Sequence, residues 1–102
     1  MRFGPWYPLA EAGTHAPAAE GVLQMRLADG VLDYPRGKSA MVHYAHAPDV
    51  RAAALAFATD YQGPPLVCRH LDPEGEPVDL AAFHAKVLRE FVNRFGTSPA
   101  PP

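Results

Sequence analysis

The amino-acid sequence predicts a small α+β domain in the order ββαβα, with a three-stranded central sheet flanked by two main helices. Three patterns carry this prediction. Apolar and polar residues alternate over 21–28, an apolar stripe at helical spacing follows Pro48, and a wider apolar arc runs through 79–95. These patterns predict one strand and two helices, around which the shorter elements can be placed.

The chain has 102 residues, of which 48% are hydrophobic, and this composition fits one compact domain. We expect residues 1–20 to form an irregular N-terminal lead-in, because prolines and alanines interrupt any pattern there. Residues 21–96 are expected to form the α+β domain itself. Residues 97–102 are expected to be a disordered, proline-rich tail.

The first strand is expected at 21–28, where the alternation has the period of two that is typical of a half-buried strand. Asp29-Gly30 follows, a dipeptide that favours a tight turn, so 31–34 can return as a short hairpin arm before Pro35 stops it. A second apolar segment at 40–46 is expected to form the next strand.

The first helix is expected near 49–62, with an acidic residue at its start and Gly63 after its end. A short apolar run at 66–71 has the length of a strand. The longest helix is expected at 79–95, and Gly96 is its natural stop. The sheet would therefore contain three strands, mixed or antiparallel, between two helices.

Charge and cysteine content limit the function classes. The formal net charge of −2 argues against strong overall attraction to phosphate backbones, although a local basic patch is compatible with it. A single cysteine, Cys68, cannot form an intramolecular disulfide and fits a reducing compartment. No apolar run approaches the length of a membrane span. We expect a cytoplasmic protein without a membrane partner.

Four short features occur in a fixed order along the chain: Gly21-Val22-Leu23, His43-Tyr44-Ala45, Asp49-Val50, and Glu90 followed by Pro99. In order and spacing they resemble the motifs of the GIY-YIG domain, a small ββαβα fold best known from DNA-cleaving enzymes. In that family, a tyrosine of the first motif helps to activate the attacking water. An arginine of the following helix stabilises phosphate charge, and a glutamate of the late helix binds a metal ion.

The chain departs from this pattern at the positions that carry the chemistry. Leu23 stands at the first tyrosine, and leucine cannot accept a proton. His43 stands at the second tyrosine, or Tyr44 one residue later on the opposite face of the strand. The arginine position falls near Ala53, and the nearest cation, Arg51, lies about 200° around the helix. The insertion between the two motif strands is also longer than in the family.

The candidate catalytic residues are the polar side chains at or beside the motif positions: His43, Tyr44, Arg51 and Glu90. Glu90 is also the candidate metal ligand, so Mg²⁺ or Mn²⁺ is expected only if nuclease chemistry is retained, and no other cofactor is predicted. The five histidines show no ligand spacing that indicates zinc.

Each candidate also has a purely structural interpretation. Lys86 and Arg94 both lie one helical turn from Glu90, so exposed ion pairs would account for that carboxylate. His43 can be a strand histidine with one satisfied hydrogen bond, and Tyr44 can pack on the sheet with its hydroxyl in water.

The segment Tyr34-Pro35-Arg36-Gly37-Lys38-Ser39 is the candidate binding segment. Tyr34, Arg36 and Lys38 are its candidate ligand-binding residues, because two cations and exposed backbone N–H groups can hold a phosphate. The segment lacks the full phosphate-loop pattern and no helix follows it directly, so a solvated loop is the alternative.

Two function classes therefore remain. In the first, a GIY-YIG-like domain has lost nuclease chemistry and acts as a binding or scaffold module for nucleic acid or for another protein. In the second, the domain is an active metal-dependent phosphodiesterase in which Tyr34, His43, Arg51 or Arg36, and Glu90 act from shifted positions. An unrelated small α+β fold is a third possibility. The two function classes differ in whether the catalytic groups converge in one cleft.

Overall fold

The computed structural model describes residues 1–102, and it contains more strands and helices than the predicted ββαβα order with its three-stranded sheet. The elements are β1 (Arg2–Phe3), β2 (Tyr7–Pro8), a 3-10 turn (Leu9–Glu11), α1 (Ala12–His15), β3 (Gly21–Leu27), β4 (Leu32–Tyr34), β5 (Gly37–Ser39), β6 (Met41–Ala47), α2 (Val50–Asp60), β7 (Leu66–Asp72) and α3 (Leu80–Phe95). The α+β class is thus confirmed. The predicted strands at 21–28, 40–46 and 66–71 correspond to β3, β6 and β7.

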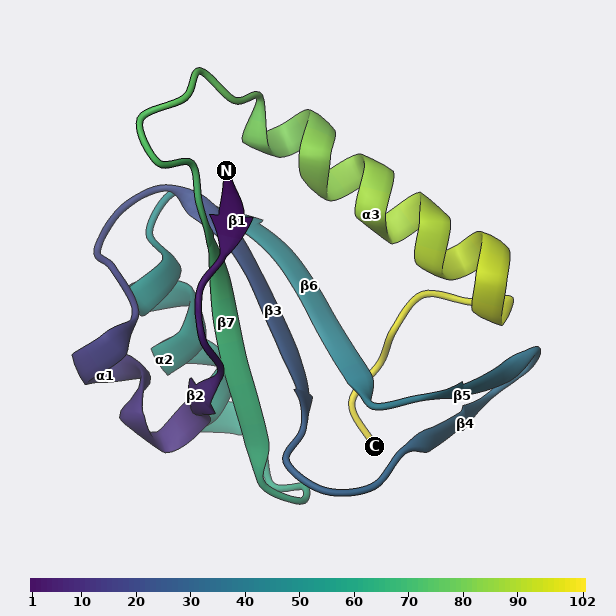
Figure 1. The fold of residues 1–102 in the computed structure, drawn as a ribbon. Coiled ribbons are helices and arrows are strands. Elements are labelled where there is room, and N and C mark those ends of the chain that lie inside the picture. Colours follow the sequence, from purple (N-terminus) through teal and green to yellow (C-terminus); the bar gives the residue numbers. More distant parts are fainter.

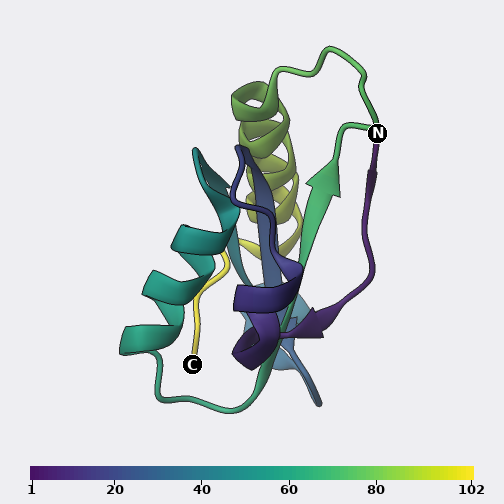
Figure 2. The same cartoon turned by 90° about the vertical axis from the view of Figure 1, so that its left-hand side faces the viewer.

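The main sheet is antiparallel and has five strands in the order β1–β7–β3–β6, with β2 also paired to β7. The central strand β3 pairs with β6 on one edge and with β7 on the other. The sheet separates two layers of helices, with α1 and α2 against one face and α3 against the other (Figures 1 and 2).

The alternation along β3 divides its side chains between these two faces, as the period of two predicts. Leu23 and Met25 are fully buried in the cluster that also contains Val50 and Ala54 of α2. Val22 is fully buried on the other face, where it packs with Leu80 of α3. A sheet covered on both faces explains why β3 is buried along almost its whole length.

Both long helices begin and end at local signals. The side chain of Asp49 accepts a hydrogen bond from the backbone N–H of Ala52 at 2.9 Å, and Asp79 does the same for Ala82 at 3.0 Å. Gly96 ends α3 in the left-handed conformation, with φ 88°. The helices predicted at 49–62 and 79–95 are confirmed to within the usual uncertainty of helix ends. None of the helices combines the length and apolar character needed to cross a lipid bilayer.

The short hairpin differs from the prediction. The segment 31–34 was expected to return against the first strand, but β4 pairs with β5, and the turn lies at Pro35-Arg36. The physical reason is that β6 and β7 already occupy both edges of β3, which leaves no free edge for β4. Pro35-Arg36 is therefore the tip of a two-stranded hairpin that projects from the sheet, and Gly37 and Lys38 belong to β5 (Figure 1).

The first twenty residues contribute to the core, whereas the sequence pattern indicated only an irregular lead-in. The strands β1 and β2 extend the β7 edge of the sheet, and Tyr7 and Leu9 are buried. Ala12 and Ala16 are fully buried in the same cluster as Ala54 of α2. Small residues lack a strong periodic signal, but they allow α1 to lie close to α2.

The C-terminal residues 97–102, expected to be disordered, run back from α3 toward the α2 side of the sheet (Figure 2). The Tyr34 hydroxyl is 3.4 Å from the carbonyl oxygen of Ala100 and 3.3 Å from its backbone nitrogen. Pro101 and Pro102 border a cavity beside α2. A contact with the hairpin, which no local pattern encodes, gives the tail this position.

Candidate functional site

A groove of about 330 Å³ lies between α3 and the sheet, and it brings together polar side chains from four elements. β3, β6 and β7 contribute one polar side chain each, and α3 contributes an acidic and a basic one. These side chains are Gln24, Tyr44, Arg69, Glu90 and Arg94. Two of the predicted site residues, Tyr44 and Glu90, are thus found in the same groove.

Strand register places the three sheet residues side by side. Gln24 is directly opposite Tyr44 on β6 and directly opposite Arg69 on β7. Directly opposed residues project from the same face of a sheet, so all three side chains point toward α3. The Arg69 Nε donates a hydrogen bond of 2.9 Å to the side-chain oxygen of Gln24, which fixes one side of the guanidinium.

A second arginine and a tryptophan lie next to this row. The Arg69 guanidinium is 4.5 Å from the centre of the Trp6 ring and 4.3 Å from that of Phe3. The guanidinium of Arg26 is 4.0 Å from the Trp6 ring centre. Both arginines are half-buried. We refer to Trp6, Arg26 and Arg69 as the arginine–tryptophan cluster.

The positive charge of this cluster is not neutralised by the protein. No carboxylate lies within 4.0 Å of the guanidinium nitrogens of Arg26 or Arg69. Burial and, next in size, repulsion from Arg26 lower the pKa of Arg69. An arginine stays protonated despite such a shift, so the cluster carries two adjacent positive charges.

The tyrosine in the groove is unsuited to accept a proton. Burial raises the pKa of Tyr44, and the favourable effect of Arg69 on its ionised form is smaller. The ring packs edge-on against Phe91 with a centroid distance of 5.7 Å. The neutral phenol can donate a hydrogen bond to a ligand oxygen in the groove.

Glu90 lies in the groove without an ion-pair partner. Neither Lys86 nor Arg94 comes within 4.0 Å of its carboxylate, so the ion pairs suggested by the helical spacing are not formed. No group of three or more His, Cys, Asp or Glu side chains gathers here or elsewhere in residues 1–102 in a way that could hold a metal ion.

The other two candidate catalytic residues lie on the opposite side of the sheet. His43 packs on Phe57 of α2 with ring centres 4.8 Å apart, and its pKa is lowered by burial and, to a smaller extent, by His84. The Nε of Arg51 donates to the carbonyl oxygen of Ala16 at 2.8 Å, which holds α2 against the segment after α1. The sheet separates both side chains from Tyr44 and Glu90.

The three candidate binding residues lie in or next to the β4–β5 hairpin. The Tyr34 hydroxyl donates to the carbonyl oxygen of Met41 at 2.5 Å. Arg36 donates to two carbonyl oxygens in the last turn of α3, those of residues 92 and 93, at 3.1 and 2.7 Å. Lys38 forms an exposed ion pair with Asp33 at 3.5 Å. Arg36 therefore caps α3 through its Nη2, which holds the guanidinium against the last turn of that helix.

Sequence reasoning missed the arginine–tryptophan cluster and Gln24. The polar positions of β3 were visible as the alternate residues of a strand, and this was the one local signal for Gln24 and Arg26. Arg69 lies within the short apolar run at 66–71, which gives no periodic signal for it, and Trp6 lies in a segment without periodicity. The register between β3 and β7 decides that these residues meet.

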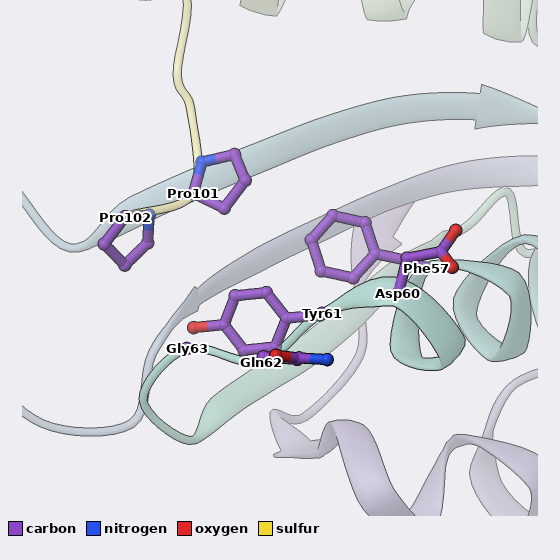
Figure 3. A pocket seen from close by; sticks show the side chains of 7 residues that line it. All are labelled: Phe57, Asp60, Tyr61, Gln62, Gly63, Pro101 and Pro102. Carbon is purple, nitrogen blue, oxygen red and sulfur yellow. The ribbon is translucent and has the colours of Figure 1, made fainter.

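A larger cavity, of about 500 Å³, lies beside the C-terminal end of α2 and is distinct from the groove (Figure 3). The rings of Phe57 and Tyr61 lie on one side of it, and those of Pro101 and Pro102 lie on the other. Asp60 is its one ionisable side chain other than Tyr61. Its lining is suited to apolar contacts, whereas the groove under α3 gathers charged groups.

No protein-family model, curated protein or solved structure matches this chain.

Proposed function

We propose that this protein is a GIY-YIG-like binding domain that has lost nuclease chemistry and that holds single-stranded nucleic acid at the groove under α3. The observation that carries the proposal is the pair of half-buried guanidinium groups of Arg26 and Arg69, which share Trp6 and face no carboxylate. Burying two adjacent positive charges costs free energy unless an anion compensates it. The phosphate groups of a ligand are suited to that role.

The aromatic residues around the arginines favour a nucleic acid over a free phosphate ion. Proteins that bind single strands combine cationic grooves with aromatic side chains on which bases stack. Trp6 is only partly buried, and Tyr44 and Phe3 lie along the same face. The net charge of −2 means that such binding depends on this local cluster and not on the charge of the whole protein. A cytoplasmic location belongs to the same proposal.

The absence of catalysis is part of the proposal. Phosphodiester hydrolysis needs a group that activates water and a group that stabilises phosphate charge, and usually a metal ion held by carboxylates. Leu23 has no functional group and is buried on the opposite face, and burial keeps Tyr44 protonated. The arginines could stabilise phosphate charge, but Glu90 is the one carboxylate of the groove, and a single carboxylate cannot both hold a metal ion and activate water.

A second candidate is an active phosphodiesterase, and one observation favours it. Tyr44 and Glu90 line the same groove as Arg69 and Arg94, which is the convergence that an enzyme requires. In this alternative, Glu90 binds Mg²⁺ or Mn²⁺ and the arginines bind the phosphate. Cleavage assays with divalent ions separate the two candidates.

The binding proposal can be tested with the protein's own fluorescence, because Trp6 is its single tryptophan. Purified protein is titrated with a single-stranded oligonucleotide and, in parallel, with inorganic phosphate, with excitation of the indole. We expect a saturable change that is larger for the oligonucleotide and weaker as salt increases. Arg69→Gln is expected to reduce the affinity about tenfold or more.

Arg89 supplies the matched control, since it is an exposed α3 arginine that does not line the groove. Arg89→Gln changes the net charge by the same amount and is expected to leave the affinity within about twofold. An unchanged Trp6 signal with the oligonucleotide would contradict the proposal. Equal losses in the Arg69 and Arg89 variants would also contradict it, because binding would then depend on overall charge.

A further inference from the structure

We infer that the cavity beside α2 is a docking site for a proline-rich, extended segment of a partner protein that carries a basic residue next to its prolines. This site lies beside α2, apart from the groove proposed to hold nucleic acid, and is independent of that function. The inference rests on the chain's own C-terminal segment, which borders the same cavity.

The tail is an extended segment by its own chemistry. Pro99, Pro101 and Pro102 each fix their backbone φ near −65°, and a residue that precedes proline is restricted to extended conformations. The segment 98–102 therefore favours the polyproline II conformation, which needs no hydrogen bonds within the segment. Proline-rich segments of this kind are recognised elsewhere by grooves lined with aromatic side chains.

Three aromatic side chains lie next to the tail, Tyr34 of the hairpin and Phe57 and Tyr61 at the end of α2. The Tyr34 hydroxyl meets the backbone of Ala100 at 3.3 and 3.4 Å. Beyond it, the rings of Phe57 and Tyr61 face Pro101 and Pro102 across the cavity (Figure 3). These two rings are stacked with centres 5.5 Å apart, so they present a continuous aromatic surface.

The tail leaves this surface incompletely covered. About 500 Å³ remains between the rings and the prolines, while Ala100, Pro101 and Pro102 are themselves exposed. The backbone N–H of Ala100 donates to the Tyr34 hydroxyl at 3.3 Å, and this is the only hydrogen bond that holds the tail beside this cavity. A segment from another protein could therefore replace residues 98–102 at low cost and fill the cavity more completely.

A charge at the edge of the cavity indicates the partner's chemistry. Asp60 lines the cavity, and no cationic group lies within 4.0 Å of its carboxylate. Residues 98–102 contain no cation that could pair with it. A Lys or Arg beside the prolines of a partner would supply that pairing, which the chain's own tail lacks.

The experiment uses the full chain and fluorescein-labelled peptides in anisotropy titrations. The probe is Ser-Pro-Ala-Pro-Pro-Arg, and the two control peptides replace either its arginine with glutamate or all its prolines with alanine. We expect the probe to bind more tightly than either control. Loosening the chain's own tail with Pro101→Gly and Pro102→Gly together is expected to increase the affinity about twofold or more, because the competing segment is weakened.

Two variants test the lining residues. Tyr61→Ala should abolish binding of the probe, and Asp60→Asn should reduce the preference for arginine over glutamate by up to about fivefold without affecting the fold. Circular dichroism establishes that both variants are folded, and amide shifts of residues 57–63 locate the peptide on the full chain.

Three outcomes would overturn the inference. The first is equal binding of the probe and its alanine control, and the second is an affinity that the glycine substitutions in the tail do not change. The third is concentration-dependent dimerisation of the full chain that disappears in the Pro101→Gly, Pro102→Gly variant, since the cavity would then be filled by the tail of a second copy.

Discussion

Arg69 on β7 donates a hydrogen bond of 2.9 Å to the side chain of Gln24 on β3, directly opposite it in the sheet. Gln24 is the one buried polar residue of the protein, with 4% of its surface exposed. Because this bond holds the guanidinium beside the rings of Trp6 and Phe3, the geometry of the arginine–tryptophan cluster depends on Gln24.

The first prediction concerns that bond. Gln24→Leu removes the acceptor of a half-buried charged group, so we expect the free energy of unfolding to fall by about 1–3 kcal/mol. Gln24→Glu keeps an acceptor of the same shape but adds a negative charge beside Arg69. Urea midpoints should therefore be nearly unchanged for Gln24→Glu, while its Trp6 fluorescence response to the oligonucleotide is lost. A Gln24→Glu protein that binds like the parent would show that the arginine charges are not used.

The second prediction concerns Phe91, which is buried at the centre of an aromatic group formed with Tyr34, Tyr44 and Phe95. Truncation to alanine leaves a cavity between α3, the sheet and the β4–β5 hairpin. We expect Phe91→Ala to reduce the free energy of unfolding by about 3–5 kcal/mol, as measured by urea denaturation. A variant that keeps the parent's midpoint would mean that α3 packs through a different face.

The third prediction concerns the response to acid. Burial, together with His84, lowers the pKa of His43 below its ordinary value of 6.5, and burial lowers that of His70. The unfolded chain therefore binds protons more readily than the folded protein, so stability is complete above about pH 6.5 and decreases as the pH falls below it. His43→Phe keeps the contact with Phe57 and should make this decrease smaller, with His70 left to contribute the remainder.

Urea midpoints between pH 5 and pH 8 measure this effect directly. The parent's midpoint should fall toward pH 5, and the His43→Phe midpoint should fall less. Parallel curves for the two proteins would show that His43 is not the titrating group.

The fourth prediction is that the protein does not cleave DNA or RNA, even when Mg²⁺ or Mn²⁺ is supplied. Catalytic groups act as a unit, so a groove whose one carboxylate, Glu90, cannot both hold a metal ion and activate water should have no measurable activity. Purified protein is incubated with supercoiled plasmid and with single-stranded RNA across several divalent ions. Glu90→Ala controls for contaminating nuclease. Metal-dependent cleavage by the parent that disappears in Glu90→Ala would favour the active phosphodiesterase instead.

The long elements could be predicted from the sequence because their signals are local. The alternation in β3, the capping aspartates of α2 and α3, and the stop at Gly96 each act within a few residues of the chain. The same reasoning could not predict the partner of β4, since the pairing of a strand depends on which sheet edges are already occupied.

The candidate site shows the same division. Glu90, Tyr44, His43 and Arg51 all lie at or beside motif positions, so the sequence made them equal candidates for the site. Only the face of the sheet that each side chain occupies shows that Glu90 and Tyr44 lie together and that His43 and Arg51 do not. A shift of one residue along a strand moves a side chain to the other face. This explains why neighbouring residues such as His43 and Tyr44 lie on opposite sides of the sheet.

The α+β class and the positions of β3, β6, β7, α2 and α3 could thus be predicted from the sequence, because periodicity and helix caps are properties of short segments. The clustering of Trp6, Arg26 and Arg69 and the position of the C-terminal prolines beside α2 could be found only in the folded protein. Those residues are distant along the chain, and they meet because antiparallel register and packing on both faces of one sheet bring them together.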